Sequence, residues 1–204
     1  MTDNFKQMKR LMDFSDENRF YYLQILARSK DGNSKATKVV KNYYITNEEY
    51  LDEREEQIKD LCRFFSARAY LRLNRRSYEK VAYENLKQIA NSLSYRQYEF
   101  VRKSYSKACG RTNDEPNRIW ILDFDEKDYN SIDELQVELA NCKMYVRTLQ
   151  TEIQKDYKII GEVNTPGGVH LLTNPFNKKE FSDKYNSVDI HTDNPTVLFA
   201  PDFD

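Results

Sequence analysis

Cysteine and histidine are scarce in this chain of 204 residues, which contains three of the first and two of the second. The cysteines are Cys62, Cys109 and Cys142, which are far apart and not grouped with histidines. An odd number of widely spaced cysteines supports neither a disulfide framework nor a cysteine-rich zinc site. We therefore expect free thiols and no structural zinc ion.

Long apolar runs are also absent, since no segment approaches the ~20 consecutive apolar residues needed to cross a bilayer. Residues 1–10 are polar and lack the apolar region of a secretory signal. Hydrophobic residues still make up 39% of the chain and aromatic residues 13%, which is enough for a folded core. We expect one cytoplasmic domain over 1–204, with no membrane partner.

The net charge of -1 conceals an uneven distribution of charge along the chain. Residues 61–111 hold twelve lysines and arginines against three acids, a local net charge of +9, so the remaining residues carry -10. Such a segment concentrates positive potential on one surface and attracts polyanions. Nucleic acid is the candidate partner, and a solvated helix face without a partner is the alternative.

Hydrophobic periodicity predicts a mixture of helices and hairpins. Helices are expected at 4–14, at 48–64, at 77–107 with a break at 92–94, and from 131 onward. A second helical piece with Tyr145, Leu149 and Ile153 follows, and a short helix is expected after Asn177. Strands are expected at 19–28 and 38–45 around a turn at 31–34, and at 67–74, 118–125, 158–163, 169–173, 187–191 and 196–200. Because strands and helices do not alternate strictly, the prediction is an α+β fold with a mixed, partly antiparallel sheet flanked by helices. We expect this single domain to consist of an N-terminal α/β part over 1–117, with the basic segment, and a second sheet over 118–204.

Two aspartates, Asp123 and Asp125, end the most apolar predicted strand. Side chains two positions apart on a strand project from one face, about 7 Å apart along the backbone. Paired carboxylates of this kind suit Mg²⁺ or Mn²⁺, which fill their other positions with water and substrate phosphate. The alternative is a solvated turn between strand and loop, where acids are common.

A glycine turn precedes one of the two histidines. Gly167 and Gly168 allow a ligand to approach the backbone closely, and strand parity puts His170 on the side opposite Val169. His170 can then bind a triphosphate or move a proton; the alternative is a packed histidine bonded to the backbone. His191 has no such context and is interpreted as structural or exposed.

A third carboxylate, Asp189, lies within a short predicted strand. Its neighbours Val188 and Ile190 are apolar and are expected to point into the core, so Asp189 points to the opposite face of the strand. A charged side chain within a central strand is disfavoured unless a partner pairs with it. A metal ion is such a partner. Asp193 is the competing choice and is more easily explained as a turn residue.

The predicted strand at 67–74 alternates between small or aliphatic side chains on one face and polar ones on the other. The polar face and the two residues after the strand contain Arg68, Tyr70, Arg72, Asn74, Arg75 and Arg76. Arginine binds phosphate through two parallel hydrogen bonds, and tyrosine stacks on a base or sugar. The alternative is an exposed strand whose long side chains cover tyrosines.

Three of these segments, in this order, resemble the three motifs of the archaeo-eukaryotic primase superfamily, which includes the primase-polymerases of plasmids and phages. They are Ile-Leu-Asp-Phe-Asp at 121–125, Gly-Val-His at 168–170 and Val-Asp at 188–189. Val-Leu-Phe-Ala-Pro at 197–201 also looks like the end of the family's third-motif region. The resemblance covers 119–201. Gly168 stands where the family has serine, and the family's zinc-binding element is absent.

The resemblance implies an RRM-like catalytic core that works as a primase or a DNA or RNA polymerase, transferring nucleotides to a 3′-hydroxyl. In this interpretation Asp123, Asp125 and Asp189 are catalytic and hold Mg²⁺ or Mn²⁺. The nucleoside triphosphate is bound by His170, Gly168, Arg72 and Arg76. The nucleic acid, a single-stranded template or a primer-template, is contacted by Arg68, Tyr70, Asn74 and Arg75.

Two other classes of function stay open. The first is a non-catalytic replication accessory protein that grips nucleic acid with the basic segment 61–111. The second is a metal-dependent nuclease or phosphoesterase that uses the same carboxylates. It needs a base to activate water, for which His170 is the candidate.

Overall fold

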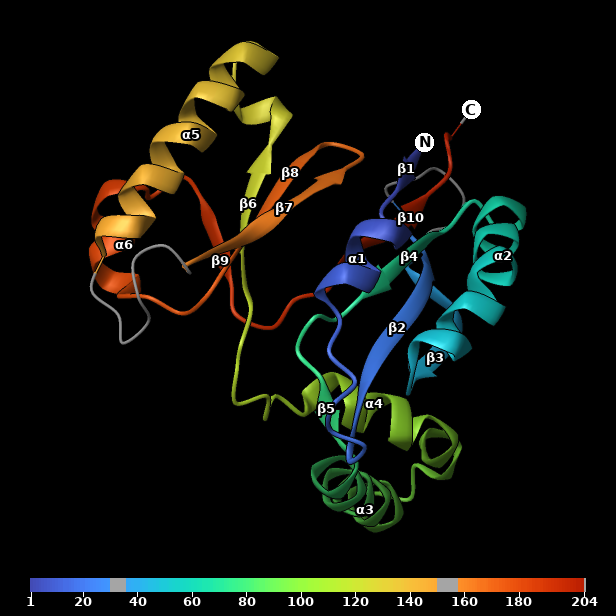
Figure 1. The fold of residues 1–204 in the computed structure, drawn as a ribbon. Coiled ribbons are helices and arrows are strands. Elements are labelled where there is room, and N and C mark those ends of the chain that lie inside the picture. The colour runs from blue at the N-terminus through green and yellow to red at the C-terminus, as the bar shows by residue number, and fades with distance from the viewer. Residues whose placement is uncertain (30–35, 150–157, 204) are drawn as a thin grey trace.

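A computed structural model describes residues 1–29, 36–149 and 158–203. Within these ranges the chain forms two antiparallel sheets that lie side by side, with helices packed on them (Figure 1). The predicted α+β class is confirmed. The expected mixed, partly antiparallel sheet is corrected to two sheets in which all described strand pairs are antiparallel. The turn expected at 31–34 and Ile153 fall outside the described residues.

The first sheet is six-stranded and draws its strands from both ends of the chain. Its strands are β1 (Thr2–Asp3), β2 (Arg19–Ala27), β3 (Lys38–Ile45), β4 (Arg68–Leu71), β5 (Arg76–Ser77) and β10 (Thr196–Ala200). They run in the order β1-β10-β4-β2-β3, and β5 pairs with the start of β2. The predicted hairpin is formed by β2 and β3, which pair over the length of β3.

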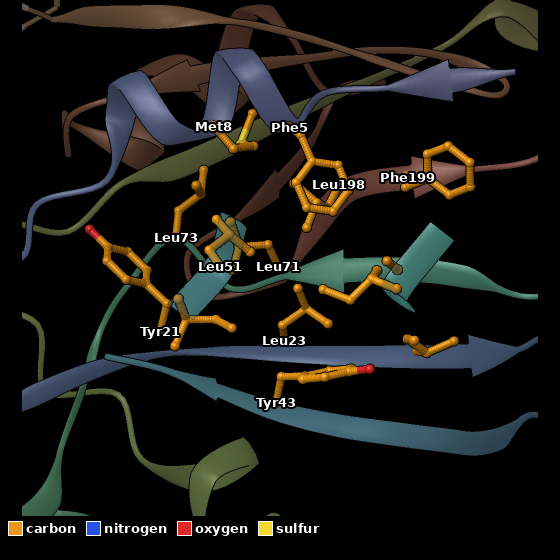
Figure 2. Packing of buried hydrophobic residues seen from close by; sticks show 14 of the residues in the cluster. Phe5, Met8, Tyr21, Leu23, Tyr43, Leu51, Leu71, Leu73, Leu198 and Phe199 are labelled. Carbon is orange, nitrogen blue, oxygen red and sulfur yellow. The ribbon is translucent and has the colours of Figure 1, made fainter. Parts of the chain in front are cut away.

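The alternation of β2 determines which helices cover which face of this sheet. Tyr21, Leu23 and Ile25 pack in one cluster with α1 (Phe5–Leu11) and α2 (Glu48–Phe64), as Figure 2 shows for Phe5 and Met8 above Leu23. Phe20 and Tyr22 point the other way, to α3 (Tyr78–Ser94) and α4 (Ser104–Arg111), which a 3₁₀ turn at Tyr98–Lys103 connects. The six-stranded sheet is therefore covered by α1 and α2 on one face and by α3 and α4 at one end of the other.

The second sheet contains β6 (Trp120–Asp125), β7 (Ile159–Thr165), β8 (Gly168–Thr173) and β9 (Asp189–His191), in the order β7-β8-β6-β9. Two helices, α5 (Ile132–Thr148) and α6 (Lys178–Lys184), pack on one face of it (Figure 1). Both begin where the sequence predicts. Ser131 caps α5 by accepting from the Glu134 N–H at 3.2 Å, and Asn177 caps α6 by accepting from the Glu180 N–H at 3.2 Å.

The other face of the four-stranded sheet is apolar at one end and polar at the other. Ile121, Val163 and Leu172 form the apolar end, and they belong to the same buried cluster as α1 and the first sheet. The two sheets thus share one core. The polar end of that face, which carries Asp123 and His170, lies at the junction of the two sheets.

The structure departs from the sequence prediction in several places. Strand β4 ends at Leu71 rather than at residue 74, and α4 continues to Arg111, through the start of the loop predicted from Cys109. The helix persists because Ala108 and Cys109 are buried against Phe20 of β2. Strand β10, expected to close the sheet of 118–204, pairs instead with β4 and β1.

All three cysteines are buried and free. Burial raises the pKa of each thiol to about 12. In the described part of the chain, no helix combines the length and the apolar composition that spanning a membrane requires.

Candidate active site

A cavity of about 310 Å³, here named the junction pocket, opens where the two sheets meet. Both sheets contribute to its wall. The four-stranded sheet and its loops provide Asp123, Asp125, Lys127, Thr165, Pro166, Gly167 and His170, and the six-stranded sheet provides Arg28, Arg68, Tyr70 and Val197. Five residues that the sequence singles out as site residues are therefore brought together here.

The register of the four-stranded sheet sets the positions of the acids and of His170. Asp123, on the central strand β6, lies directly opposite His170 of β8 and opposite Asp189 of β9. Residues that face each other across antiparallel strands have Cβ atoms about 4.5–5.5 Å apart, on one face of the sheet. Residues from all three motifs are consequently neighbours on one sheet face.

Asp123 lies between two imidazoles. Nε2 of His170 is 3.4 Å from Oδ1 of Asp123, and Nε2 of His191 is 3.7 Å from Oδ2. Burial alone would raise the pKa of Asp123, but hydrogen bonding and charge attraction from the two histidines hold it well below its usual value. The Asp123 carboxylate in turn raises the pKa of His191. The charge of Asp189 acts in the same direction, and the burial of His191 acts against both. Asp123 is therefore ionised.

The presence of His191 at the site was missed by the sequence interpretation, which took it as structural or exposed. The available signal was parity, because a residue two positions after Asp189 on a strand lies on the same face as Asp189. Each imidazole is also held by a hydrogen bond at its other ring nitrogen, Nδ1. Nδ1 of His170 is 2.8 Å from Oγ1 of the buried Thr196, and Nδ1 of His191 is 2.9 Å from Nδ2 of Asn194.

Gly168 has a structural requirement of its own. A Cβ at this position would lie 1.9 Å from the carbonyl oxygen of Phe124, and the φ of Gly168 is +157°. Glycine permits β8 to approach β6 this closely. The close approach inferred from the sequence is thus made by the backbone of β6, and Gly167, rather than Gly168, lines the junction pocket.

The donor set of the pocket fits an open magnesium-type site. Mg²⁺ is usually held by one or two carboxylates, together with water and substrate phosphates, rather than by a cage of protein ligands. Asp123 and Asp125 provide two such carboxylates on one wall, although Asp125 also forms an ion pair with Lys127. Asp189 is exposed, on the strand beside Asp123. Among the described residues, no group of three or more His, Cys, Asp or Glu side chains is positioned to hold a metal ion.

The basic residues predicted to share one face divide into two groups. Arg68 and Tyr70 line the junction pocket, together with Arg28, which donates to the Tyr70 hydroxyl at 2.8 Å and was not among the predicted residues. Arg28 is the last residue of the predicted strand at 19–28 and directly follows β2, which ends at Ala27. Only its position at the end of β2, opposite the start of β4, brings it to the site.

The second group lies away from the pocket and is engaged inside the protein. The buried Arg76 pairs with Asp193, and Arg72 donates to the same carboxylate at 3.2 Å. Arg75 pairs with Glu115 at 2.9 Å, and the side chain of Asn74 bonds to the backbone of Ile119 and Thr192. The predicted continuous basic face is wrong beyond Tyr70, because acids distant in sequence fold back onto these arginines.

The junction pocket has two carboxylates on one wall, with Lys127 beside them, and two arginines on the other. Asp123 and Asp125 can share a divalent cation, while Arg28 and Arg68 of the opposite wall can neutralise phosphate oxygens. A ligand that carries both phosphates and a metal ion matches this division of charge. Comparison of the chain with protein-family models, with curated proteins and with solved structures gives no match.

Proposed function

We propose that this chain is a metal-dependent nucleotidyltransferase of the archaeo-eukaryotic primase type, adding nucleotides to a 3′-hydroxyl on a nucleic-acid template. One observation carries the proposal. Asp123 and Asp125 from the first motif and His170 from the second line one pocket, opposite Arg68 and Tyr70 of the other sheet. These are the residue types that binding a nucleoside triphosphate with its metal ion requires.

The topology of the second sheet supports the proposed RRM-like core. Its elements follow the order β6-α5-β7-β8-α6-β9, and its strands lie in the order β7-β8-β6-β9 with antiparallel neighbours. This is the β-α-β-β-α-β pattern of ferredoxin-like sheets. Asp123 and His170 stand on its two central strands, β6 and β8.

In the proposed site each residue has a role that its position suits. Asp123 and Asp125, with Asp189 beside them, hold Mg²⁺ or Mn²⁺, which when bound polarises phosphoryl oxygens. His170, oriented by Thr196, can turn its Nε2 hydrogen bond from Asp123 to a phosphate of the nucleotide when Asp123 holds the metal ion. Its ring stays in place because its other nitrogen is already bonded.

The cations of the opposite wall are suited to bind the negatively charged phosphates of substrate and product. Arg28 and Arg68 can pair with phosphate oxygens of the triphosphate and of the leaving pyrophosphate. Tyr70 is 8% exposed, and its hydroxyl accepts from Arg28, so its role in the proposed site is to hold Arg28 at the pocket wall. Both arginines come from the six-stranded sheet, so the nucleotide bridges the two sheets.

The test is incubation of the wild type and of Asp123→Asn with labelled nucleoside triphosphates, Mg²⁺ or Mn²⁺, and single-stranded templates with and without an annealed primer. We expect products with the wild type and none with Asp123→Asn. Asp133→Asn, an exposed acid in the first turn of α5, is the matched control and keeps full activity. Equal product from Asp123→Asn and the wild type would reject the proposal.

A second candidate, a metal-dependent phosphoesterase, is favoured by one observation. The second imidazole at Asp123, from His191, adds to His170 as a base that can activate water. The same experiment separates the two activities. Shortened templates with no extension identify the phosphoesterase, and tight nucleic-acid binding without any reaction identifies an accessory protein.

A further inference from the structure

A second cavity, of about 510 Å³, is lined by residues of β2, α3 and α4 and of the 3₁₀ turn between the two helices. We name it the helical cavity. Three cations and an aromatic ring belong to its wall, together with small and polar side chains. Its lining includes Gln24 of β2 and Phe100, Lys103, Lys107 and Arg111 of the helical part. Among the described residues, none that lines the cavity carries a carboxylate.

The helical cavity and the junction pocket open on the same face of the six-stranded sheet. Gln24 of the helical cavity is the direct cross-strand partner of Tyr70, which lines the junction pocket. Leu26, two residues after Gln24, packs with Tyr70 and Val197 on that face. The face is opposite the one covered by α1 and α2, and the Gln24–Tyr70 pair lies between the two cavities.

The cations of the helical cavity are available to a ligand. Lys103 and Lys107 are exposed, and within the described residues neither forms an ion pair. Arg111 has one loose ion pair, with Glu84 at 3.6 Å. Because Arg72, Arg75 and Arg76 are engaged inside the protein, the free positive charge of 61–111 lies mainly on this helical part.

Exposed aromatic rings accompany these cations. Phe100, in the wall of the cavity, is 45% exposed, and its neighbours Tyr95 and Tyr98 are 74% and 62% exposed. Rings of this size are usually buried, so three of them in one short segment indicate a surface with a partner. A basic groove with aromatic rings on which bases stack is the arrangement that binds single-stranded nucleic acid without sequence preference.

We propose that a single-stranded nucleic acid binds along this face, from the helical cavity across Gln24 and Tyr70 to the junction pocket. The inference rests on the proposed function and assigns the path of its template strand. Lys103 and Lys107 contact phosphates, and Phe100 stacks on a base. The part of the strand that crosses Tyr70 is delivered to Asp123 and Asp125.

The experiment measures binding alone, with fluorescently labelled single strands of about 4 and about 16 nucleotides, the range of site sizes found for such grooves. The protein carries Lys103→Ala with Lys107→Ala, or Phe100→Ala. The matched control is Lys6→Ala with Arg10→Ala, which removes the same charge from α1 on the covered face of the sheet. The titrations contain no nucleotide and no divalent metal, and thermal unfolding verifies that each variant is folded.

For the longer strand we expect about tenfold weaker binding for either variant of the helical cavity, and no change for the control. The lysine pair should also flatten the dependence of log K on log salt concentration by roughly 1.4, because each phosphate contact to a single strand contributes about 0.7. The shorter strand should show a smaller loss, since it can occupy the junction pocket alone.

Equal affinity of the lysine variant and the control for the longer strand would overturn the inference. So would displacement of that strand by polyglutamate as effectively as by unlabelled DNA, because the surface would then suit an acidic protein. The outcome is separable from that of the proposed function. Loss of binding without any nucleotide incorporation by the wild type keeps the strand path and rejects the enzyme, while unchanged binding with incorporation does the reverse.

Discussion

The guanidinium of Arg76 donates two parallel hydrogen bonds to the carboxylate of Asp193, from Nη1 to Oδ1 at 3.0 Å and from Nη2 to Oδ2 at 2.6 Å. Arg76 is fully buried and belongs to the six-stranded sheet, whereas Asp193 follows the last strand of the four-stranded sheet. Asn74 adds bonds to the backbone of Ile119 and Thr192. These contacts fix the two sheets against each other, and with them the two walls of the junction pocket.

Replacing Arg76 should therefore be costly. Arg76→Met leaves Asp193 with part of its hydrogen bonding, and breaking a buried ion pair typically costs about 3–5 kcal/mol. Urea unfolding measures the change in the free energy of unfolding. Arg63→Met, which removes an exposed pair with Asp60, is the control and should cost less than about 1 kcal/mol. An Arg76→Met protein as stable as the control variant would contradict this account of the sheet junction.

Gly168→Ala should destabilise the protein, and Gly167→Ala should not. A Cβ at Gly168 would overlap the Phe124 carbonyl oxygen at 1.9 Å, whereas a Cβ at Gly167 meets nothing within 4 Å. Overpacking and a strained backbone each cost about 1–3 kcal/mol, so we expect a loss of about 2 kcal/mol or more. The midpoints of thermal unfolding of the two variants, compared side by side, test this. Similar midpoints would mean that β8 can move away from β6.

His170→Ala should weaken binding of a nucleoside triphosphate about tenfold or more, because a hydrogen bond to a charged group contributes about 1.5–3 kcal/mol. Thr196→Val, which removes the hydroxyl bonded to Nδ1 of His170, should weaken it less and in the same direction. Calorimetric titration with a nucleoside triphosphate and Mg²⁺ measures both. Affinity for a single-stranded oligonucleotide is the internal control and should stay unchanged. The reverse pattern would assign His170 to the nucleic acid.

The free energy of unfolding should fall as the pH rises from about 9 toward 12. Burial raises the pKa of Cys62, Cys109 and Cys142 from 9.0 to about 12, so in this interval the unfolded chain ionises its thiols and the folded protein does not. Ionisation of the thiols then favours the unfolded state. Below pH 9 the thiols are protonated in both states, so their burial stabilises the folded protein in full. Buried tyrosines such as Tyr43 act in the same direction, since the pKa of Tyr43 is raised to about 12.

Urea midpoints at pH 8 and pH 10.5 measure this dependence. Replacing all three cysteines by alanine should reduce the difference between the two midpoints without abolishing it, because the tyrosines remain. At pH 8 the folded wild type should also react far more slowly with a thiol reagent than the urea-unfolded chain does. Rapid reaction of three thiols in the folded protein would be inconsistent with their burial.

The features predictable from sequence are those that local chemistry determines. Helix α2 begins after Asn47, whose side chain accepts from the Tyr50 N–H at 2.7 Å, and it ends at the predicted residue, Phe64. The apolar run that leads into Asp123 and Asp125 defines β6 in the same way. Each signal lies within a few residues of the structure that it specifies, so a single sequence is sufficient.

The features that the sequence did not reveal depend on partners far along the chain. Alternation predicts that Arg72 and Asn74 point away from the apolar face, but it cannot distinguish a solvated arginine from one that meets a distant carboxylate such as Asp193. Strand β10 has the same ambiguity. Residues 196–200 are buried throughout, so their composition suits either sheet.

The position of β10 between β1 and β4 affects how the chain can fold during synthesis. The hydrogen-bonding edge of β4 stays open until residues 196–200 emerge, after the entire four-stranded sheet has been made. At about 5–20 residues per second this interval lasts roughly 6–25 s. An uncovered strand edge can pair with other chains, so a nascent chain is most prone to aggregate in this interval, and completing the first sheet depends on prompt folding of the second.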